Sequence, residues 1–422
     1  MRSHHSRTFA VLLVVLSLVA VSCGDDDDDG GATAEESSSS TTAAEETDGG
    51  EEPTGEPFTI GVVNIEGAPS FDFPEFTDGF DAAAKYVNEQ LGGFGGRPIE
   101  IEECIAQGTP ESSQQCAQEL ASKDVELALI GLDIFTDYNT FAAAGIPVIG
   151  SVPILPGDYS ADAIYLTGGN LSAMSAIAKV AQEVVGAKTV GIISTDNAAG
   201  NAAVQILEPA LTNAGIEFTT VKGGDNETDA GYQGLVRQAA EGDPDALISL
   251  YAGPGCVGTI RARKSLGIEA PAITTGLCRS KDVIDVVGDD AVGWIFATGD
   301  DSGEAMDTVR NGVAELKGIE PDEVNTGGFT VIGWLIFMTM AEVGQELAAD
   351  DPAALTGQAI YDEMKSSTDR TLWSSENVYE CGQEPAYPTV CTYAVQFSEY
   401  KPGGELALIG EGEFISGQDL LP

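Results

Sequence analysis

From residue 58 onward, short β-branched segments alternate with longer amphipathic segments, and this alternation restricts the chain to few folds. Residues 58–64 (FTIGVVN) are predicted to form a strand, residues 75–90 carry apolar side chains at helical spacing, and residues 98–104 are again strand-like. The next expected elements are helix 112–122, strand 125–131, helix 136–144 and strand 147–150. Strands separated by helices of about 10 to 15 residues indicate right-handed βαβ units and parallel sheets.

The same alternation restarts at Leu171. The elements expected there are helix 171–185, strand 189–194, helix 200–213, strand 216–221, helix 230–241, strand 245–251, helix 256–266, strand 272–275, helix 280–287 and strand 292–298. Two such series in one chain predict an α/β fold with two doubly wound lobes.

The carboxyl-terminal part is predicted to add two helices and a hairpin. The helices are expected at 304–317 and 326–347, and the second contains the apolar run 331–340. A run of ten residues is too short to cross a membrane, so it indicates a buried core helix. The last stretch, from Thr371, contains Cys381, Cys391 and an expected strand over 392–397. It is predicted to be a hairpin that is closed by a disulfide and packed on one lobe.

The amino terminus has the charge order of an export signal. Basic residues precede the apolar run 9–21, which is too short to span a bilayer, so residues 1–22 are predicted to be a signal peptide. The sequence Ala20-Val21-Ser22-Cys23-Gly24 resembles a bacterial lipobox, although Ala20 stands where that motif usually has Leu. The resemblance implies lipidation of Cys23; the alternative is ordinary cleavage with an incidental cysteine.

The segment 23–56 is predicted to be a disordered acidic tether. It carries 13 acids and no base, and such a composition buries too little apolar surface to fold. We expect it to hold the folded part away from the membrane.

Charge and histidine content exclude several functions. The chain has 68 acids against 19 bases, a net charge of −49, which disfavours nucleic acid and anionic lipid surfaces as partners. Its two histidines, His4 and His5, both lie in the predicted signal peptide. A mature chain without histidine has no Ser-His-Asp or Cys-His triad and no zinc site with a histidine ligand. A G-x-S-x-G motif is also missing, so we expect neither an enzyme nor a cofactor or metal.

Without Cys23, six cysteines remain in a compartment where disulfides persist. Fifteen pairings are formally possible. Nearness in sequence favours three local pairs: Cys104 with Cys116, Cys256 with Cys278, and Cys381 with Cys391. The alternative, a metal cluster, lacks both C-x-x-C spacing and histidine.

A glycine-rich segment and several later junctions indicate a family. The stretch Asn88 followed by residues 92–99 (GGFGGRPI) resembles the helix-to-strand junction of periplasmic solute-binding proteins of the branched-chain amino acid type. A dinucleotide-binding loop would follow a strand and open a helix, which is the opposite polarity. Residues 144–149 (AGIPVI), 244–246 (PDA) and 264–267 (KSLG) match the same family in the same order, so the resemblance covers about 57–422.

That resemblance implies a type I fold with discontinuous lobes and three hinge crossovers. We place the crossovers near 167–170, near 298–302 and between 350 and 372. Lobe 1 is then 57–168 plus 302–360, and lobe 2 is 169–301 plus 361–422. The ligand is expected between the lobes, outside the carboxyl ends of the strands, with hinge closure as the functional motion.

The expected ligand-binding residues follow the strands of both lobes. They are Asn64, Ser70, Phe71, Asp133, Ile134, Ser151, Val152, Asp196, Asn197, Tyr251, Ala252 and Gly253. Asp133 departs from the family, which usually presents Ser and Thr hydroxyls there to a ligand carboxylate. Ala199 replaces a tyrosine that the family often has. Phe71 is equally well interpreted as a hydrophobic loop anchor, and the 251–256 segment as a turn closed by a disulfide.

The resemblance implies a lipid-anchored, extracytoplasmic substrate-binding protein of an ABC transporter. It implies a membrane permease and ATPase subunits on other chains as partners. The default ligand is a branched-chain or related amino acid, and Asp133 suggests a cationic or amide ligand as a variant. The alternative function is a sensor whose two lobes report to a regulatory partner.

Overall fold

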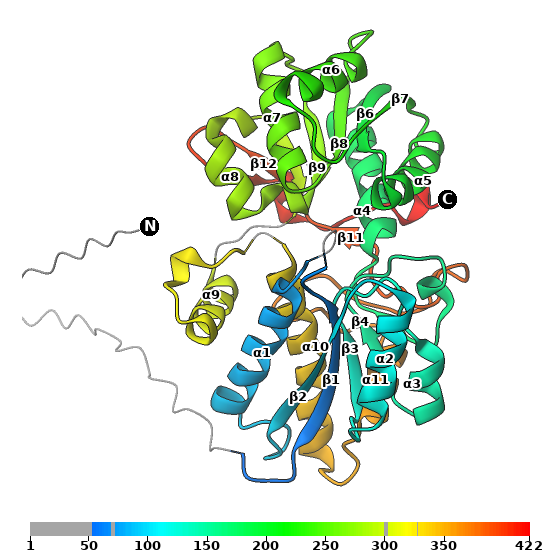
Figure 1. Ribbon diagram of the computed structural model, residues 1–422, viewed down its shortest axis with the longest axis vertical. Helices are drawn as coiled ribbons and strands as arrows, with labels where there is room; N and C mark the ends of the chain where they lie inside the picture. Colours follow the sequence, from blue (N-terminus) through cyan, green and yellow to red (C-terminus); the bar gives the residue numbers. More distant parts are fainter. Residues whose placement is uncertain (1–52, 69–71, 299–302, 327) are drawn as a thin grey trace, which may run out of the picture. The chain divides into compact units, whose positions relative to one another are not determined.

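The computed structural model describes residues 53–68, 72–298, 303–326 and 328–422 (Figure 1). The first sheet has five parallel strands in the order β2-β1-β3-β4-β5. These are β1 (Phe58–Ile65), β2 (Ile99–Ala106), β3 (Leu127–Ile130), β4 (Val148–Gly150) and β5 (Ile164–Tyr165). The short strand β5 is absent from the sequence prediction, since two residues give no periodicity to detect.

Helices connect and cover this sheet. They are α1 (Glu75–Leu91), α2 (Pro110–Ala121), α3 (Tyr138–Ala144), α9 (Glu304–Lys317), α10 (Phe329–Asp350) and α11 (Gly357–Ser366). Figure 1 shows α1 and α10 side by side on one side of the sheet, and α2 and α3 on the other. The expected core helix is therefore confirmed: α10 has the length and apolar composition of a membrane span, but it packs along α1, with Trp334 and Phe337 fully buried.

Two glycines allow α1 and α10 to approach closely. A Cβ at Gly79 would lie 2.3 Å from the Thr330 carbonyl oxygen, and one at Gly333 would lie 2.7 Å from the Phe76 carbonyl oxygen. Any side chain at either position would push the helices apart, so the absence of a Cβ sets their spacing.

The second sheet has the strand order β13-β12-β10-β9-β8-β6-β7. Its strands are β6 (Thr189–Thr195), β7 (Glu217–Gly223), β8 (Ala246–Leu250), β9 (Ala272–Thr275), β10 (Trp294–Ala297), β12 (Ser398–Tyr400) and β13 (Leu406–Leu408). Strands β6 to β10 are parallel, and β12 and β13 add an antiparallel edge. The helices are α4 (Gly169–Lys179), which continues as a π-helix (Val180–Val185), α5 (Ala198–Asn213), α6 (Asp229–Ala239), α7 (Pro254–Leu266) and α8 (Lys281–Val287).

The prediction for the carboxyl-terminal segment is wrong in two respects. The expected strand 392–397 is reduced to β11 (Ala394–Val395), which pairs with β14 (Ile415–Ser416). Strand β12 begins only after it, at Ser398, and pairs with β10. The segment bearing Cys381 and Cys391 is a loop without a hairpin. It has two isolated bridges, one between Thr371 and Val378 and one from Val390 to Tyr165 of β5. The alternation of side chains gave no information on which partner each short strand would find.

The third crossover also lies later than predicted. Residues 361–391 belong with the first sheet, because Tyr361 and Met364 of α11, Leu372 and Tyr379 are buried in its core. The burial of Phe397 in the core under the second sheet puts the crossover close to residue 392. The sequence prediction did not include α11. The apolar face of this helix packs into the core of the first sheet, so the chain stays with that sheet beyond residue 360.

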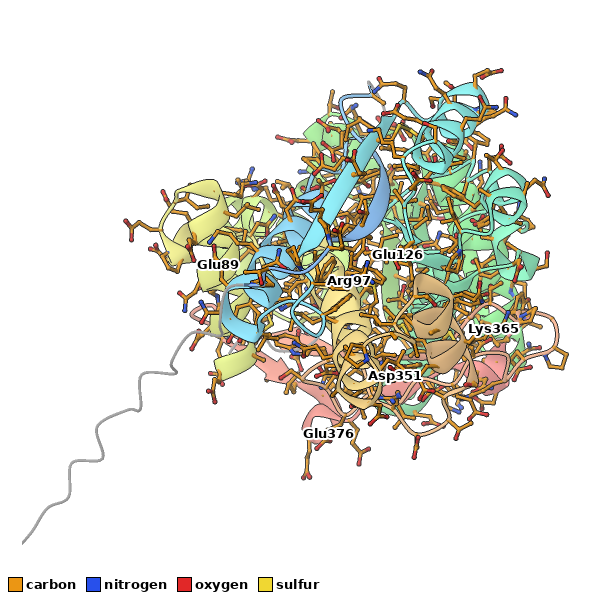
Figure 2. All side chains as sticks on the ribbon, turned by 90° about the horizontal axis from the view of Figure 1, so that it is seen from below. Glu89, Arg97, Glu126, Asp351, Lys365 and Glu376 are labelled. Atoms are coloured by element: carbon orange, nitrogen blue, oxygen red, sulfur yellow. A yellow bond between two sulfur atoms is a disulfide. The ribbon has the colours of Figure 1, made fainter. Side chains whose placement is uncertain are left out.

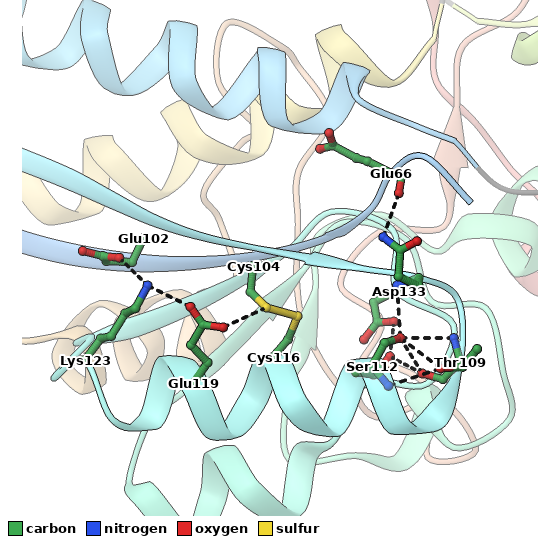
Figure 3. The surroundings of a disulfide bond; sticks show 11 residues. Glu66, Glu102, Cys104, Thr109, Ser112, Cys116, Glu119, Lys123 and Asp133 are labelled. Carbon is green, nitrogen blue, oxygen red and sulfur yellow. Dashed lines mark hydrogen bonds and ion pairs between the residues drawn. A yellow bond between two sulfur atoms is a disulfide. The ribbon is translucent and has the colours of Figure 1, made fainter. Parts of the chain in front are cut away.

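The three predicted disulfides are confirmed as Cys104–Cys116, Cys256–Cys278 and Cys381–Cys391. Figure 3 shows the first one joining β2 to α2, with Lys123 nearby between Glu102 and Glu119. Each bridge links neighbouring segments, so it fixes local structure.

The glycine-rich segment after α1 has a structural role. Arg97 donates to the carbonyl oxygens of Glu56 (3.0 Å) and Pro57 (2.7 Å), and forms an ion pair with Glu126 (Figure 2). Its guanidinium also lies 5.0 Å from the centre of the Phe58 ring. These contacts hold the amino ends of β1 and β3 together, at the sheet edge opposite the expected ligand site.

Candidate ligand-binding site

The predicted site residues lie where the parallel strands end. The loops after β1, β3 and β4 share one edge of the first sheet, and the loops after β6 and β8 share one edge of the second, because neighbouring parallel strands end on the same side. Ser70 and Phe71 lie outside the described residues. The predicted residues that are described fall into structural, buried and exposed groups.

Asn64 is a structural residue at the end of β1. Its side chain is fully buried; Nδ2 donates to the Phe73 carbonyl oxygen (2.7 Å) and Oδ1 accepts from the Leu132 amide (2.9 Å). Further bonds from Nδ2 reach Glu66 and Thr77. Asn64 therefore joins β1, α1 and the loop after β3, and its amide group is fully used within the protein.

Asp133 is turned toward α2. Its side chain is buried and accepts hydrogen bonds from Ser113 Oγ (2.6 Å) and the Phe135 amide (3.4 Å). Figure 3 shows Asp133 beside the first turn of α2. Burial raises the pKa of this carboxyl, and its hydrogen bonds to Ser113 and Phe135 oppose the rise. Asp133 thus fixes the loop after β3 to α2 through hydrogen bonds inside the protein.

The loop after β4 contains Ser151 and Val152. Ser151 is fully buried; its amide donates to the Ile130 carbonyl oxygen (2.8 Å), and its Oγ has no hydrogen-bond partner among the described residues. Val152 is half-buried and packs on the core of the first sheet. One hydroxyl is therefore available at this strand end, below the surface.

A buried carboxylate that sequence reasoning missed holds the same loop. Asp158 Oδ2 accepts from the amides of Ile154 and Leu155, both at 2.7 Å, and Oδ1 accepts from the Tyr138 hydroxyl at 2.7 Å. The Tyr138 hydroxyl also contacts that of Tyr165. Burial raises the pKa of Asp158, and these hydrogen bonds lower it. The only signal in the sequence was an acidic residue three to four positions after the two amides that it binds. Such spacing is common in a chain this acidic.

In the second sheet, Asp196 and Asn197 follow β6. Asn197 Oδ1 accepts from the Gly200 amide (2.8 Å) and so caps α5, while its Nδ2 donates to Asp225 (2.6 Å). Asp196 is exposed, and its amide donates to the Gly223 carbonyl oxygen (2.8 Å). Asn197 is a helix cap, and the carboxylate of Asp196 faces solvent.

Tyr251 belongs to the core of the second sheet. Its hydroxyl donates to the Gly224 carbonyl oxygen (3.2 Å) and its ring packs edge to face with Tyr232. Burial raises its pKa. Ala252 and Gly253 are exposed, and Gly253 has φ 50° at the start of α7. Of these three predicted residues, Ala252 and Gly253 are exposed and Tyr251 is buried.

The first sheet instead exposes apolar side chains at this edge. Phe135 after β3 and Leu155 after β4 are 37% and 36% exposed. Ile134, Val152 and Ile154 lie half-buried with them. Sequence reasoning singled out Ile134 and Val152, but missed Phe135, Ile154 and Leu155, although all five follow strand ends.

Among the described residues, no group of three or more His, Cys, Asp or Glu side chains has the arrangement of a metal site. A cavity of about 240 Å³ lies at the opposite edge of the first sheet, between α3 and α11. Its polar groups already pair: Lys365 Nζ lies 3.1 Å from the Tyr361 hydroxyl and 3.6 Å from Asp162. Lys365 is labelled in Figure 2, which views the protein from below relative to Figure 1.

A comparison with family models identifies one family, and solved structures share the fold. The profile of the periplasmic binding protein family matches residues 57–398. An ABC transporter substrate-binding protein from Sphaerobacter thermophilus is 20% identical, with 87% of this chain and 100% of that chain covered and a TM-score of 0.70. A substrate-binding protein of an ABC transporter from Aeropyrum pernix is 17% identical over 87% and 98% of the two chains, with a TM-score of 0.67.

A third structure was solved with a ligand. It is the branched-chain amino acid transporter substrate-binding protein LivJ from Streptococcus pneumoniae, in complex with isoleucine. It is 14% identical, with 84% of this chain and 99% of that chain covered and a TM-score of 0.61. A comparison with curated protein sequences gives no match.

Proposed function

Since the chain belongs to the periplasmic binding protein family, we propose that it is the substrate-binding protein of an ABC importer. It captures a small solute between two lobes and delivers it to a membrane permease and ATPase subunits on other chains. The observation that carries this proposal is the extent of the family match, which includes all the parallel strands of both sheets.

The connections between the sheets support hinge closure. The crossover at 166–169 runs beside the crossover near 392, and the two are joined by hydrogen bonds. Thr392 Oγ1 donates to the Leu166 carbonyl oxygen (2.7 Å), and Ser172 Oγ donates to the Thr392 carbonyl oxygen (2.8 Å). Paired crossovers bend together, which is what rotation of one lobe against the other requires.

The protein is proposed to act outside the cytoplasm. Residues 1–22 serve as its signal peptide, and lipidated Cys23 anchors it to the membrane. The tether 23–56 then gives the lobes a reach of roughly 30 Å from that anchor. Metabolic labelling with a fatty acid tests the anchor: label is expected on the wild type and lost in Cys23→Ser.

The proposed ligand is a small polar or amphipathic metabolite. Branched-chain and related amino acids are the first ligands to test, because LivJ was solved with isoleucine. The test combines thermal shift and small-angle X-ray scattering with a library of amino acids, amides, amines, sugars and short peptides. At least one solute is expected to raise Tm and reduce the radius of gyration together. A library in which no solute does both would contradict the proposal.

A further inference from the structure

The loop 381–391 is fixed to the first sheet at its base. The disulfide between Cys381 and Cys391 closes the loop. The Tyr165 amide of β5 donates to the Thr389 carbonyl oxygen (2.7 Å), and the Cys391 amide donates to the Tyr165 carbonyl oxygen (2.9 Å). Since a disulfide and two backbone hydrogen bonds hold the base, the loop moves together with β5.

The tip of this loop contacts the carboxyl-terminal segment of the chain. Gln418 Nε2 donates to Glu384 Oε1 at 2.8 Å. The Tyr387 hydroxyl donates to the main-chain oxygen of Pro422 at 3.3 Å. The ring of Tyr387 also packs edge to face with that of Tyr159, with ring centres 5.5 Å apart. Two side chains of the tip therefore contact residues that follow β14.

The carboxyl-terminal segment is in turn fixed to the helices of the second sheet. Asn213 of α5 donates to the carbonyl oxygens of Leu420 and Leu421, both at 3.1 Å. Lys179 of α4 lies 2.7 Å from Asp419, and Leu420 is buried in the core under the second sheet. Figure 1 shows the carboxyl terminus beside α5. The tip of the loop thus joins an element held by the first sheet to one held by the second.

An apolar cluster beside the hinge surrounds these contacts. Its buried members are Tyr159, Leu171, Val390 and Tyr393. Val390 is bridged to β5 of the first sheet, whereas Leu171 lies in the first turn of α4 and Tyr393 follows the crossover near 392. Closely packed side chains fit one arrangement of their neighbours, so rotation about the crossovers must repack this cluster.

The arrangement that these contacts hold leaves the ligand edges of both sheets accessible. Phe135 and Leu155 at the first sheet are 37% and 36% exposed. Asp196 and Gly253 at the second sheet are exposed as well. A small ligand enclosed between two lobes has most of its surface buried by them. Exposed strand-end residues on both sheets therefore indicate an open arrangement of the lobes.

We infer that the loop 381–391 is a brace between the lobes, which favours the open arrangement and lowers the affinity for the ligand. Its contacts join two anchored elements, so closure must break them. A contact made only in the open state stabilises that state, and ligand binding must offset this difference. Glu384, Tyr387 and Gln418 thus determine affinity without touching the ligand. The inference rests on the lobe rotation of the proposed function.

The first test measures the separation of the lobes without any ligand. Spin labels are attached to Gln114→Cys on α2 and Gln238→Cys on α6, both exposed positions, without reductant so that the disulfides persist. Double electron–electron resonance then gives the distribution of distances. In Tyr387→Ala/Gln418→Ala, a second population displaced by several Å is expected, as hinge rotation requires. A distribution identical to that of the wild type would overturn the inference.

The control removes a matched pair of side chains from within the first-sheet helices. In Tyr86→Ala/Gln345→Ala, a half-buried tyrosine loses its ring contact with Trp334 (5.5 Å), and a half-buried glutamine loses its bond to the Leu91 carbonyl oxygen (3.5 Å). The wild-type distances are expected. A shift as large as in the brace variant would overturn the inference. Tyr387→Phe, which loses only the hydroxyl, is expected to give a smaller second population and replaces the double variant if that does not fold.

Affinity gives the second test. For each solute that closes the lobes in the library screen, Tyr387→Ala/Gln418→Ala is expected to bind about three- to tenfold more tightly than the wild type, because closure no longer breaks the contacts of the brace. Equal or weaker binding would overturn the inference. If no solute closes the lobes, the proposed function fails, whereas the spin-label distances still decide whether the loop restrains them.

Discussion

At the scale of single residues, carboxylates shape the loops that would face a ligand. Asp133 and Asp158 are buried and accept hydrogen bonds from the backbone of their own loops. Each carboxylate takes the place of water as the hydrogen-bond acceptor for amides that lie below the surface. Removing one carboxylate therefore leaves those donors unsatisfied. Acidic residues near strand ends therefore act as internal supports in this chain, and only some of them contact solvent.

Replacing Asp158 tests this support directly. Asp158→Ala removes three hydrogen bonds and is expected to lower the free energy of unfolding by about 2–4 kcal/mol. Hydrogen exchange of the Ile154 and Leu155 amides is expected to become faster. The control is Asp162→Ala, whose side chain is 75% exposed, lies 3.6 Å from Lys365 Nζ and accepts a long hydrogen bond from the Tyr361 hydroxyl (3.4 Å); a change within about 0.5 kcal/mol is expected. Equal effects of the two substitutions would contradict the supporting role.

Asp81 gives a second prediction at this scale. Burial raises its pKa to about 7, with further contributions from Glu103, Asp78 and Glu66. Folded Asp81 keeps its proton to higher pH than the unfolded chain does, so its contribution to stability falls as pH rises from about 4 through 7. Asp81→Asn should match the wild type near pH 4 and be more stable than the wild type at pH 8 by about 1 kcal/mol. The expected value is modest because Glu103 is exposed, so solvent screens its repulsion of Asp81. Urea unfolding across this range measures it, and a constant difference at all pH values would contradict it.

At the scale of elements, the sequence predicted most of the strands and helices because their periodicity is local. Helix 304–317 and strand 272–275 were placed at their observed ends. The direction of Asp133 was not predictable, since its partner Ser113 lies on a different element. The third crossover was misplaced for a similar reason: only packing against the first sheet shows where α11 belongs. Tertiary contacts decided what periodicity left open.

The contact between α1 and α10 provides a prediction for an element pair. In Gly79→Ala the new methyl group would lie 2.3 Å from the Thr330 carbonyl oxygen, so the helices must separate, at an expected cost of about 1–3 kcal/mol. The control is Gly234→Ala in α6, where a Cβ meets no atom within 4 Å. Higher helix propensity there is expected to stabilise the protein by about 0.5–1 kcal/mol. Chemical denaturation of both variants checks the opposite signs, and stabilisation by both would contradict the close packing.

At the scale of the whole molecule, acidity is a property of the folded part and of the tether alike. Residues 57–422 carry 55 acids and 17 bases, a net charge of −38. Among the described residues, the ion pairs of Lys281 with Asp285 and of Lys365 with Asp162 are exposed on both sides, and such pairs contribute little. The excess negative charge therefore repels itself across the surface, which is tolerable where dissolved cations screen it.

Salt is accordingly expected to stabilise the protein. Raising sodium chloride from about 0.02 M to about 0.5 M shortens the Debye length from roughly 20 Å to roughly 4 Å, which removes most repulsion between separated carboxylates. Tm is expected to rise by several degrees, with most of the gain at the low end of this range because screening saturates. Scanning calorimetry at pH 7.5 measures the rise, and sucrose at matched osmolality serves as the control for solvent exclusion. A Tm that stays flat or falls with added salt would mean that local ion pairs outweigh the net charge, and the interpretation of this surface as adapted to a saline medium would be wrong.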